Sequence, residues 1–265
     1  MEDIFHRIMS LSEEQLILYL AYFMIISGFI TCAYMILLKQ RATYGRYGNE
    51  AFLSNLAIPA RVAWFVQESP SLVIPAIALA YYGGNMNLSK TIAFLMFVGH
   101  YWNRTLCYPF LINGGKPTPP HLMFLGLVFC LWNGYIQGFY HVKYADFASD
   151  HPRQLISQLG IALFLCGMFI NIHSDSILRN LRKPGDKGYK IPRGGMFEFV
   201  SGANFLGEIL EWTGYAIYCR SVPALAFAVF TASNIGPRAL HHHEWYKTKF
   251  EDYPKDRHAV IPLLL

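Results

Sequence analysis

The sequence predicts an all-α, polytopic membrane protein with seven transmembrane helices in a single domain, residues 1–265. Of its 265 residues, 54% are hydrophobic and 15% are charged, whereas soluble domains usually carry about 25% charged residues. The mean hydropathy is +0.27. Apolar stretches of about 20 residues, the length that a helix needs to cross a bilayer, recur along the chain. Because the loops between them are short, any chemistry must lie among the helices.

The predicted spans follow one another in a simple order. The first is apolar throughout, and it lacks the preceding basic residues of a secretory signal peptide, so we expect it to be retained. The second contains Pro70 and Pro75, the third contains His100 and Arg104, and the fifth continues into a basic segment. The predicted spans cover residues 15–38, 58–82, 91–112, 122–140, 155–176, 199–219 and 222–242.

The lysine and arginine residues orient these spans. With the N-terminus outside, 15 of the 22 lysines and arginines lie in cytoplasmic segments, Arg104 among them, and 5 lie outside. Cytoplasmic loops collect Lys and Arg, so we expect the C-terminus in the cytoplasm. The five cysteines are scattered through apolar segments without a CxxC pair, which argues against a disulfide framework.

The sixth span carries a polar stripe. Asn204, Glu208 and Glu211 are three or four residues apart and therefore share one helix face. A single Asn would indicate a hydrogen bond between helices. An Asn with two carboxylates favours a binding site, because ionisable groups inside a bilayer usually face a cavity or a partner.

The fifth span carries a second polar face. Asn171, Asp175 and Arg179 are spaced by four residues, and Arg182 follows before a basic loop that begins with Lys183. Arginine binds phosphate through a planar fork, so this face predicts an anionic cofactor with phosphates. Two simpler explanations stay open: a salt bridge between Asp175 and Arg179, and contact between the basic loop and lipid head groups.

The seventh span ends in a third polar face, formed by Arg238, His242 and Tyr246 at intervals of four residues. The run His241–His243 resembles a metal site at first sight. Successive residues on a helix point about 100° apart, so these three imidazoles cannot all reach one ion. With no HExxH motif in the chain, we expect no metal.

The second and third spans contain two hydrogen-bond donors in apolar surroundings, Glu68 and Tyr101. Charge is disfavoured in the middle of a span, and a neutral Glu68 can donate a hydrogen bond to a carbonyl. Together with Tyr101 it could polarise a substrate carbonyl, although Tyr101 alone would be an ordinary interfacial aromatic residue. The GxGxxG, P-loop and GxSxG motifs are absent from the sequence, which excludes a Rossmann dinucleotide site.

Four regions of the sequence resemble the steroid 5α-reductase family, and the similarity runs from about residue 57 to the C-terminus. They read AWFVQE (63–68), INIHSDSILRNLRKPG (170–185), YKIPRGGMFEFVSGANFLGEILEW (189–212), and RALHHHEWY with FEDYPKDR (238–257). The resemblance implies reduction of the Δ4 double bond of 3-oxo-Δ4-steroids with NADPH. Hydride is then added at C5 and a proton at C4.

The resemblance also implies roles for single residues. Glu68 and Tyr101 would be the catalytic residues at the steroid C3 carbonyl, with Trp64 and Glu208 also lining the substrate. The implied NADPH site comprises Asn171, Asp175, Arg179, Arg182, Tyr189, Asn204, Glu208, Arg238, His242, Tyr246 and Arg257.

The resemblance divides the domain into a peripheral first span (15–38), steroid-side spans (58–140) and NADPH-side spans and loops (155–265). We expect the steroid to enter from the lipid, and we expect neither nucleic acid nor an obligate protein partner. The membrane would be the endoplasmic reticulum in a eukaryote or the inner membrane in a bacterium. Alternatives remain open: a related membrane enone, polyprenol or enoyl-CoA reductase, an isoprenylcysteine-type methyltransferase, or a non-enzymatic sterol-binding protein.

Overall fold

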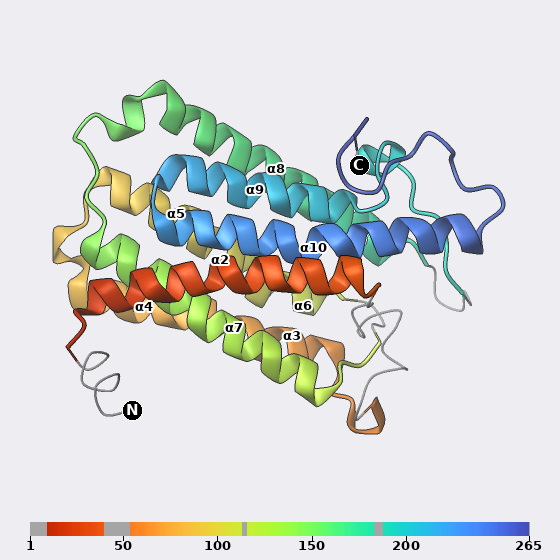
Figure 1. Ribbon diagram of the computed structural model, residues 1–265, viewed down its shortest axis with the longest axis horizontal. Coiled ribbons are helices and arrows are strands. Elements are labelled where there is room, and N and C mark those ends of the chain that lie inside the picture. The colour runs from red at the N-terminus through yellow and green to blue at the C-terminus, as the bar shows by residue number, and fades with distance from the viewer. Residues whose placement is uncertain (1–9, 40–53, 113–115, 183–187, 265) are drawn as a thin grey trace.

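The computed structural model describes residues 10–39, 54–112, 116–182 and 188–264. Within these ranges the regular structure is helical, with two isolated β-bridges and no strand. The helices lie side by side in an elongated bundle, in which α2 begins at one end and the long α10 finishes at the other (Figure 1). The prediction of an all-α fold is therefore confirmed for the part of the chain that the structure describes.

The helices differ in length and in how they are joined. They are α2 (Glu13–Leu37), α3 (Ala60–Glu68), α4 (Pro70–Tyr82), α5 (Leu88–Trp102), α6 (Tyr108–Leu111), α7 (Pro120–Phe139), α8 (Leu155–Asn180), α9 (Ala203–Cys219) and α10 (Val222–Lys249). Short 3₁₀ or π segments accompany them at η2 (Ser54–Leu56), η3 (Gly83–Asn85), η4 (Asn103–Cys107), η5 (Tyr140–Tyr144), η6 (His151–Arg153) and η7 (Gly195–Glu198).

Four described segments are long and apolar enough to cross a membrane. They are Glu13–Leu37, Ala60–Asn85, Pro120–Tyr144 and Leu155–Asn180. Of the remaining helices, α9 is only 17 residues long and α10 carries Arg238 and three histidines. The chain is thus a membrane protein by its helices, while the count of seven spans and the orientation stay predictions.

Two of the expected spans are interrupted. Within residues 58–82, α3 begins at Ala60 and meets α4 at Ser69, because Pro70 has no N–H for the next helical hydrogen bond. Residues 91–112 form α5, η4 and α6, and η4 is a π-helix. A π-turn inserts extra backbone into the helix and changes the direction of the side chains that follow it, and such turns occur frequently at functional sites.

A seam of glycines joins α8 to α9. Gly160 and Gly167 of α8 face Gly214 and Gly207 of α9, and a Cβ atom on Gly207 would lie only 2.8 Å from the Cα atom of Asn171. Small residues allow transmembrane helices to approach this closely. The seam therefore sets the polar face of α8 directly against the polar face of α9.

An aromatic core holds α5, α9 and α10 together. Trp212 of α9 is fully buried, and its ring centroid lies 4.2 Å from that of Phe227, 5.9 Å from Phe97 and 6.1 Å from Tyr101. Aromatic pairs at such distances contribute more than their buried area alone. This packing fixes the position of the Tyr101 ring within α5.

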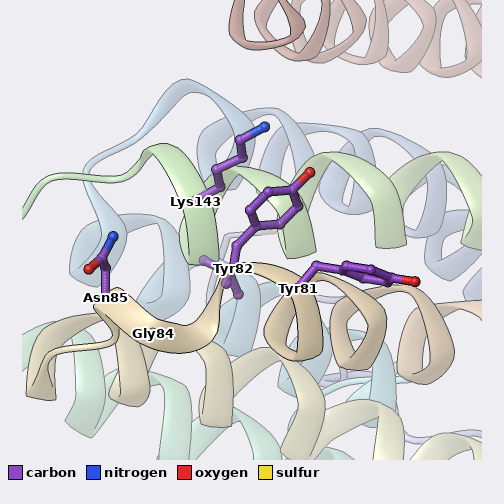
Figure 2. A pocket seen from close by; sticks show the side chains of 6 residues that line it. Tyr81, Tyr82, Gly84, Asn85 and Lys143 are labelled. Carbon is purple, nitrogen blue, oxygen red and sulfur yellow. The ribbon is translucent and has the colours of Figure 1, made fainter.

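A pocket of about 360 Å³ opens at the end of the bundle where α2 begins (Figure 2). Its lining comprises Tyr81, Tyr82, Gly84, Asn85, Val142 and Lys143. The Lys143 ammonium bonds to Glu13 Oε2 at 2.6 Å and lies 4.3 Å from the centre of the Tyr82 ring. The lysine therefore ties α2 to η5, and the residues predicted to bind substrate or cofactor lie outside this lining.

A buried histidine closes the connection before α8. His151 Nε2 donates to the backbone carbonyl of Tyr218 at 2.9 Å, and Nδ1 accepts from the guanidinium of Arg220. Burial lowers the pKa of His151, and Arg220 lowers this pKa further, while the carbonyl and Asp150 act in the opposite direction. The geometry requires the neutral imidazole with its proton on Nε2.

Candidate active site

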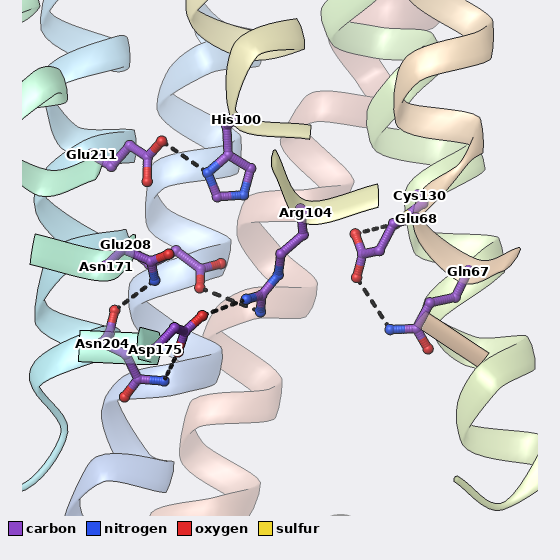
Figure 3. Close-up of polar contacts among 10 residues, drawn as sticks. All are labelled: Gln67, Glu68, His100, Arg104, Cys130, Asn171, Asp175, Asn204, Glu208 and Glu211. Atoms are coloured by element: carbon purple, nitrogen blue, oxygen red, sulfur yellow. Dashed lines mark hydrogen bonds and ion pairs between the residues drawn. The ribbon is translucent and has the colours of Figure 1, made fainter. Parts of the chain in front are cut away.

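Arg104 of η4 lies at the centre of the polar site. Its Nη1 donates to Asp175 Oδ2 at 3.3 Å, and its Nη2 lies 3.8 Å from Glu208 Oε2. Its guanidinium carbon is also 4.5 Å from the centre of the Trp64 ring. Figure 3 shows Arg104 between the carboxylates of α8 and α9 on one side and Glu68 on the other. The lysine and arginine count assigned Arg104 to a cytoplasmic segment, and the structure places it in η4, directly after α5, with its guanidinium in the site.

The predicted polar faces of α8 and α9 meet around this arginine. Asn171 Nδ2 donates to the backbone carbonyl of Asn204 at 2.9 Å, and Asn204 Nδ2 donates to Asp175 Oδ1 at 3.2 Å. Asp175 is paired with Arg104 in place of the Arg179 salt bridge considered above. The Arg179 guanidinium lies 5.6 Å from the centre of a neighbouring ring, that of Tyr108.

Glu68 and Tyr101 both reach the same face of α7. Glu68 accepts hydrogen bonds from Gln67 Nε2 at 3.1 Å and from Cys130 Sγ at 3.4 Å. The hydroxyl oxygen of Tyr101 accepts from Asn133 Nδ2 at 3.3 Å. Because Cys130 and Asn133 are three residues apart on one helix, they are neighbours on its surface. The structure therefore places the two expected catalytic side chains close together, and both are buried.

Glu211 forms a separate buried pair with His100. Its Oε1 lies 2.8 Å from His100 Nδ1, and both residues are inaccessible, at 0% and 4% exposure. Its second oxygen has no hydrogen-bond partner within the described part of the chain. The third member of the α9 stripe thus points to α5, one turn beyond the contact between Glu208 and Arg104.

Aromatic and basic side chains gather where α8 and α10 end. The Arg182 guanidinium lies 5.8 Å from the centre of the Tyr189 ring, and Tyr246 stacks on Tyr253 with ring centroids 5.4 Å apart. The guanidinium of Arg257 lies 5.2 Å from the Tyr253 ring. Arginines and flat rings in one place suit the phosphates and bases of a nucleotide.

The third polar face lies on α10, beside the start of α9. His242 packs against the ring of Phe205 with centroids 5.5 Å apart, and Arg238 precedes it by one helical turn. Where the structure describes the chain, no three His, Cys, Asp or Glu side chains gather as a metal site would need. Lys183, part of the expected basic cluster, lies outside the described residues.

Arg257 offers a test of whether an anionic cofactor fits. The residue is 3% exposed, and its Nη1 donates to the carbonyl of Pro192 at 3.1 Å. Its Nη2 lies 3.8 Å from a Glu198 carboxylate oxygen, but Nε and Nη2 have no hydrogen-bond partner within the described ranges. Buried polar groups are normally hydrogen-bonded, so a guanidinium with spare donors fits a phosphate-bearing cofactor.

Known proteins with similar sequences share one description. A family model for 3-oxo-5-alpha-steroid 4-dehydrogenase matches residues 116–265. The 3-oxo-5-alpha-steroid 4-dehydrogenase 1 of Bos taurus is 48% identical over 264 residues, covering 97% of this chain and 100% of the relative. The corresponding enzyme 1 of Homo sapiens is 49% identical over 259 residues, covering 96% of this chain and 97% of the relative. Enzyme 2 of Sus scrofa is 49% identical over 224 residues, covering 83% and 87%.

The chain belongs to the 3-oxo-5-alpha-steroid 4-dehydrogenase family. This finding confirms the resemblance drawn from the sequence motifs. In this member of the 3-oxo-5-alpha-steroid 4-dehydrogenase family, sequence reasoning missed the importance of Arg104, Asn133 and Cys130. Arg104 and Asn133 could have been found from the sequence, because they are polar residues within apolar spans. Nothing in the sequence distinguishes Cys130 from a small hydrophobic residue.

Proposed function

We propose that this chain reduces the Δ4 double bond of 3-oxo-Δ4-steroids to 5α-reduced steroids with NADPH as the reductant. One observation carries the proposal. Glu68 and Tyr101 meet at one face of α7 in apolar surroundings, and the ionic cluster of Arg104 lies beside them. The names of the relatives describe the same chemistry for those proteins.

The reaction needs a group that accepts negative charge at the steroid C3 oxygen. NADPH, when bound, supplies the hydride that becomes bonded to C5. As that bond forms, the C4=C5 electron pair moves to C3–C4 and the C3 oxygen becomes an enolate. The neutral Glu68 carboxyl and the Tyr101 hydroxyl donate hydrogen bonds to this oxygen, and such donors have most effect where water is excluded. Protonation at C4 then restores the C3 carbonyl.

The cofactor is proposed to lie against α8, α9 and α10, with Trp64 and Glu208 at its boundary with the steroid. Arg179, Arg182 and Arg257 supply positive charge for its phosphates. The complete set proposed to bind NADPH is Asn171, Asp175, Arg179, Arg182, Tyr189, Asn204, Glu208, Arg238, His242, Tyr246 and Arg257.

The finer topology is part of the same proposal. Seven spans leave the N-terminus outside and the C-terminus in the cytoplasm, so that NADPH arrives from the cytoplasm and the steroid from the lipid. The basic residues that follow α8 and α10 support this orientation. The membrane is the endoplasmic reticulum in a eukaryote or the inner membrane in a bacterium. A reporter fused after Leu265 that appeared on the outer side would contradict this topology.

The experiment is turnover by the purified protein, followed by mass spectrometry. A 3-oxo-Δ4-steroid, a polyprenyl enone and an enoyl-CoA thioester are each incubated with NADPH deuterated at the transferable hydrogen. We expect the steroid alone to be reduced, with deuterium at C5 and a solvent hydrogen at C4. Glu68→Leu is the control variant, which should still bind NADPH while its kcat falls by a factor of about 10² to 10³. Reduction of only the other two substrates, or binding of S-adenosylmethionine in place of NADPH, would overturn the proposal.

A further inference from the structure

Three buried side chains of α5 and α7 form a chain of hydrogen bonds that ends at Tyr101. Gln137 Nε2 donates to the backbone carbonyl of Pro223 at 2.7 Å and to Asn133 Oδ1 at 3.3 Å. Asn133 Nδ2 then donates to the Tyr101 hydroxyl oxygen at 3.3 Å. The exposed fractions are 1% for Gln137, 0% for Asn133 and 4% for Tyr101.

The carbonyl of Pro223 determines the direction of every bond in this chain. A carbonyl oxygen only accepts, so Gln137 must present its NH₂ group to it. The second hydrogen of that group then reaches the amide oxygen of Asn133. Asn133 must consequently present its own NH₂ group to Tyr101. The Tyr101 oxygen is an acceptor in this arrangement, and its hydroxyl hydrogen is left to donate elsewhere.

This arrangement is held rigidly. A Cβ atom on Gly134 would lie 2.9 Å from the carbonyl oxygen of Pro70, and one on Gly138 would lie 2.8 Å from the Cα atom of Pro75. The backbones of α7 and α4 therefore touch on both sides of Gln137. These contacts fix α7, and with it the backbone that carries Asn133 and Gln137, against α4.

Stability alone does not explain this chain of hydrogen bonds. Gln137 Oε1 is buried and has no hydrogen-bond partner within the described part of the protein. An amide oxygen that is buried without a partner destabilises the fold, and an apolar side chain at residue 137 would avoid this loss. Retention of the amide is consistent with a role in orienting the next residue in the chain.

We propose that Asn133 and Gln137 are positioning residues that direct the hydroxyl hydrogen of Tyr101 toward the substrate oxygen. By occupying one acceptor direction of that hydroxyl, Asn133 turns its proton away from its own position on α7. The Ser71 hydroxyl also hydrogen-bonds to Tyr101. Gln137 keeps Asn133 from turning its oxygen toward Tyr101, which would capture the proton. This inference rests on the proposed role of Tyr101 as the donor to the C3 oxygen.

The test is a double-mutant cycle between Asn133 and Tyr101, because such a cycle isolates the coupling between two groups. Asn133→Leu removes the donor at similar side-chain volume, and Tyr101→Phe removes the hydroxyl. We expect Asn133→Leu to lower kcat about three- to tenfold, the size of one neutral hydrogen bond, with the KM for NADPH unchanged. Added to Tyr101→Phe, the same substitution should lower kcat less than about twofold, because no hydroxyl is left to orient.

Two further variants keep the result interpretable. Gln137→Leu should lower kcat in the same way but less, and it carries the test if Asn133→Leu fails to fold. Ile136→Val, a fully buried position on the same helix, measures the effect of looser packing and should leave kcat within about twofold.

The two proposals fail in different ways. If Tyr101→Phe alone keeps the wild-type kcat, the role of Tyr101 is wrong and the inference falls with it. If Tyr101→Phe loses activity while Asn133→Leu and Gln137→Leu do not, only the positioning role is wrong. Losses that multiply in the double variant would likewise show that Asn133 acts independently of the Tyr101 hydroxyl.

Discussion

Replacing Arg104 with methionine tests the electrostatic design of the site. The guanidinium lies 3.3 Å from one Asp175 oxygen and 3.8 Å from one Glu208 oxygen, and the exposed fractions of the three side chains are 16%, 6% and 18%. At an effective dielectric constant of about 20, Coulomb attraction at these distances is about 5 and about 4 kcal/mol. Desolvation offsets most of this attraction, so the pairs themselves contribute little net stability.

Removing the Arg104 cation should change the free energy of unfolding by much more than the small net stability that its ion pairs contribute. The buried carboxylate of Asp175 and the partly buried one of Glu208 would then lose their shared cation, and breaking a buried pair in this way costs about 3–5 kcal/mol. For a chain of this size each kcal/mol corresponds to about 2–4 °C in Tm. We therefore expect Arg104→Met to lower the Tm of the detergent-purified, cofactor-free protein by at least about 6 °C.

Neutralising the carboxylates of Asp175 and Glu208 tests whether the loss of stability in Arg104→Met arises from charge. If the loss arises from orphaned charge, adding Asp175→Asn and Glu208→Gln to Arg104→Met should recover most of the lost Tm. The same two substitutions in the wild-type background should lower Tm, because they leave the arginine unpaired. A triple variant that is less stable than Arg104→Met would show that Arg104 stabilises the site by packing over Trp64 and not by its charge.

Other expected outcomes follow from single features. Glu68→Leu should lower kcat by a factor of about 10² to 10³ with NADPH binding retained, whereas Glu68→Gln keeps a donor and partial activity; wild-type turnover by Glu68→Leu would make this residue one of packing only. Arg182→Ala should raise the KM for NADPH in steady-state assays, and equal use of NADH and NADPH by the wild type would contradict its phosphate role. The pKa of His151 is lowered in the folded protein, so the neutral imidazole contributes fully to stability above its unfolded-state pKa of about 6.5. This contribution is lost as the pH falls below that pKa. Between pH 7.5 and 5, the Tm should therefore fall less in His151→Gln than in the wild type. Gly160→Val should abolish folding, since its Cβ would lie 2.7 Å from a backbone nitrogen of α9, while Gly236→Ala, with open space around it, should not.

The polar faces of α8 and α9 could be predicted from sequence because they depend on local geometry. Residues spaced by three or four positions share a face in any α-helix. Asn171, Asp175, Asn204 and Glu208 lie together because the glycine seam brings these two faces together. The alternative of a salt bridge between Asp175 and Arg179 is replaced in the structure by the pair with Arg104, a cation from a different helix.

The parts that could not be predicted depend on tertiary contacts. Helical spacing places Arg104 on the face of His100, four residues earlier, but it cannot show that this face meets Asp175 and Glu208. The pairing of His100 with Glu211 joins residues 111 positions apart, and periodicity within one span cannot show it. A lone Asn in a span most often indicates helix packing, and only the contact with Tyr101 distinguishes Asn133 from that ordinary case.

The glycine seam also bears on how the protein meets membranes of different thickness. α8 has 26 residues and α9 has 17, so at 1.5 Å per residue they are about 39 Å and about 26 Å long. With their backbones interlocked, the two helices cannot slide past each other to adjust to the bilayer. In a thinner membrane they must tilt together or deform the surrounding lipid. The position of Arg179 relative to the hydrocarbon layer then depends on how α8 and α9 tilt together. A change in lipid acyl-chain length would therefore change the position of the proposed cofactor side of the site.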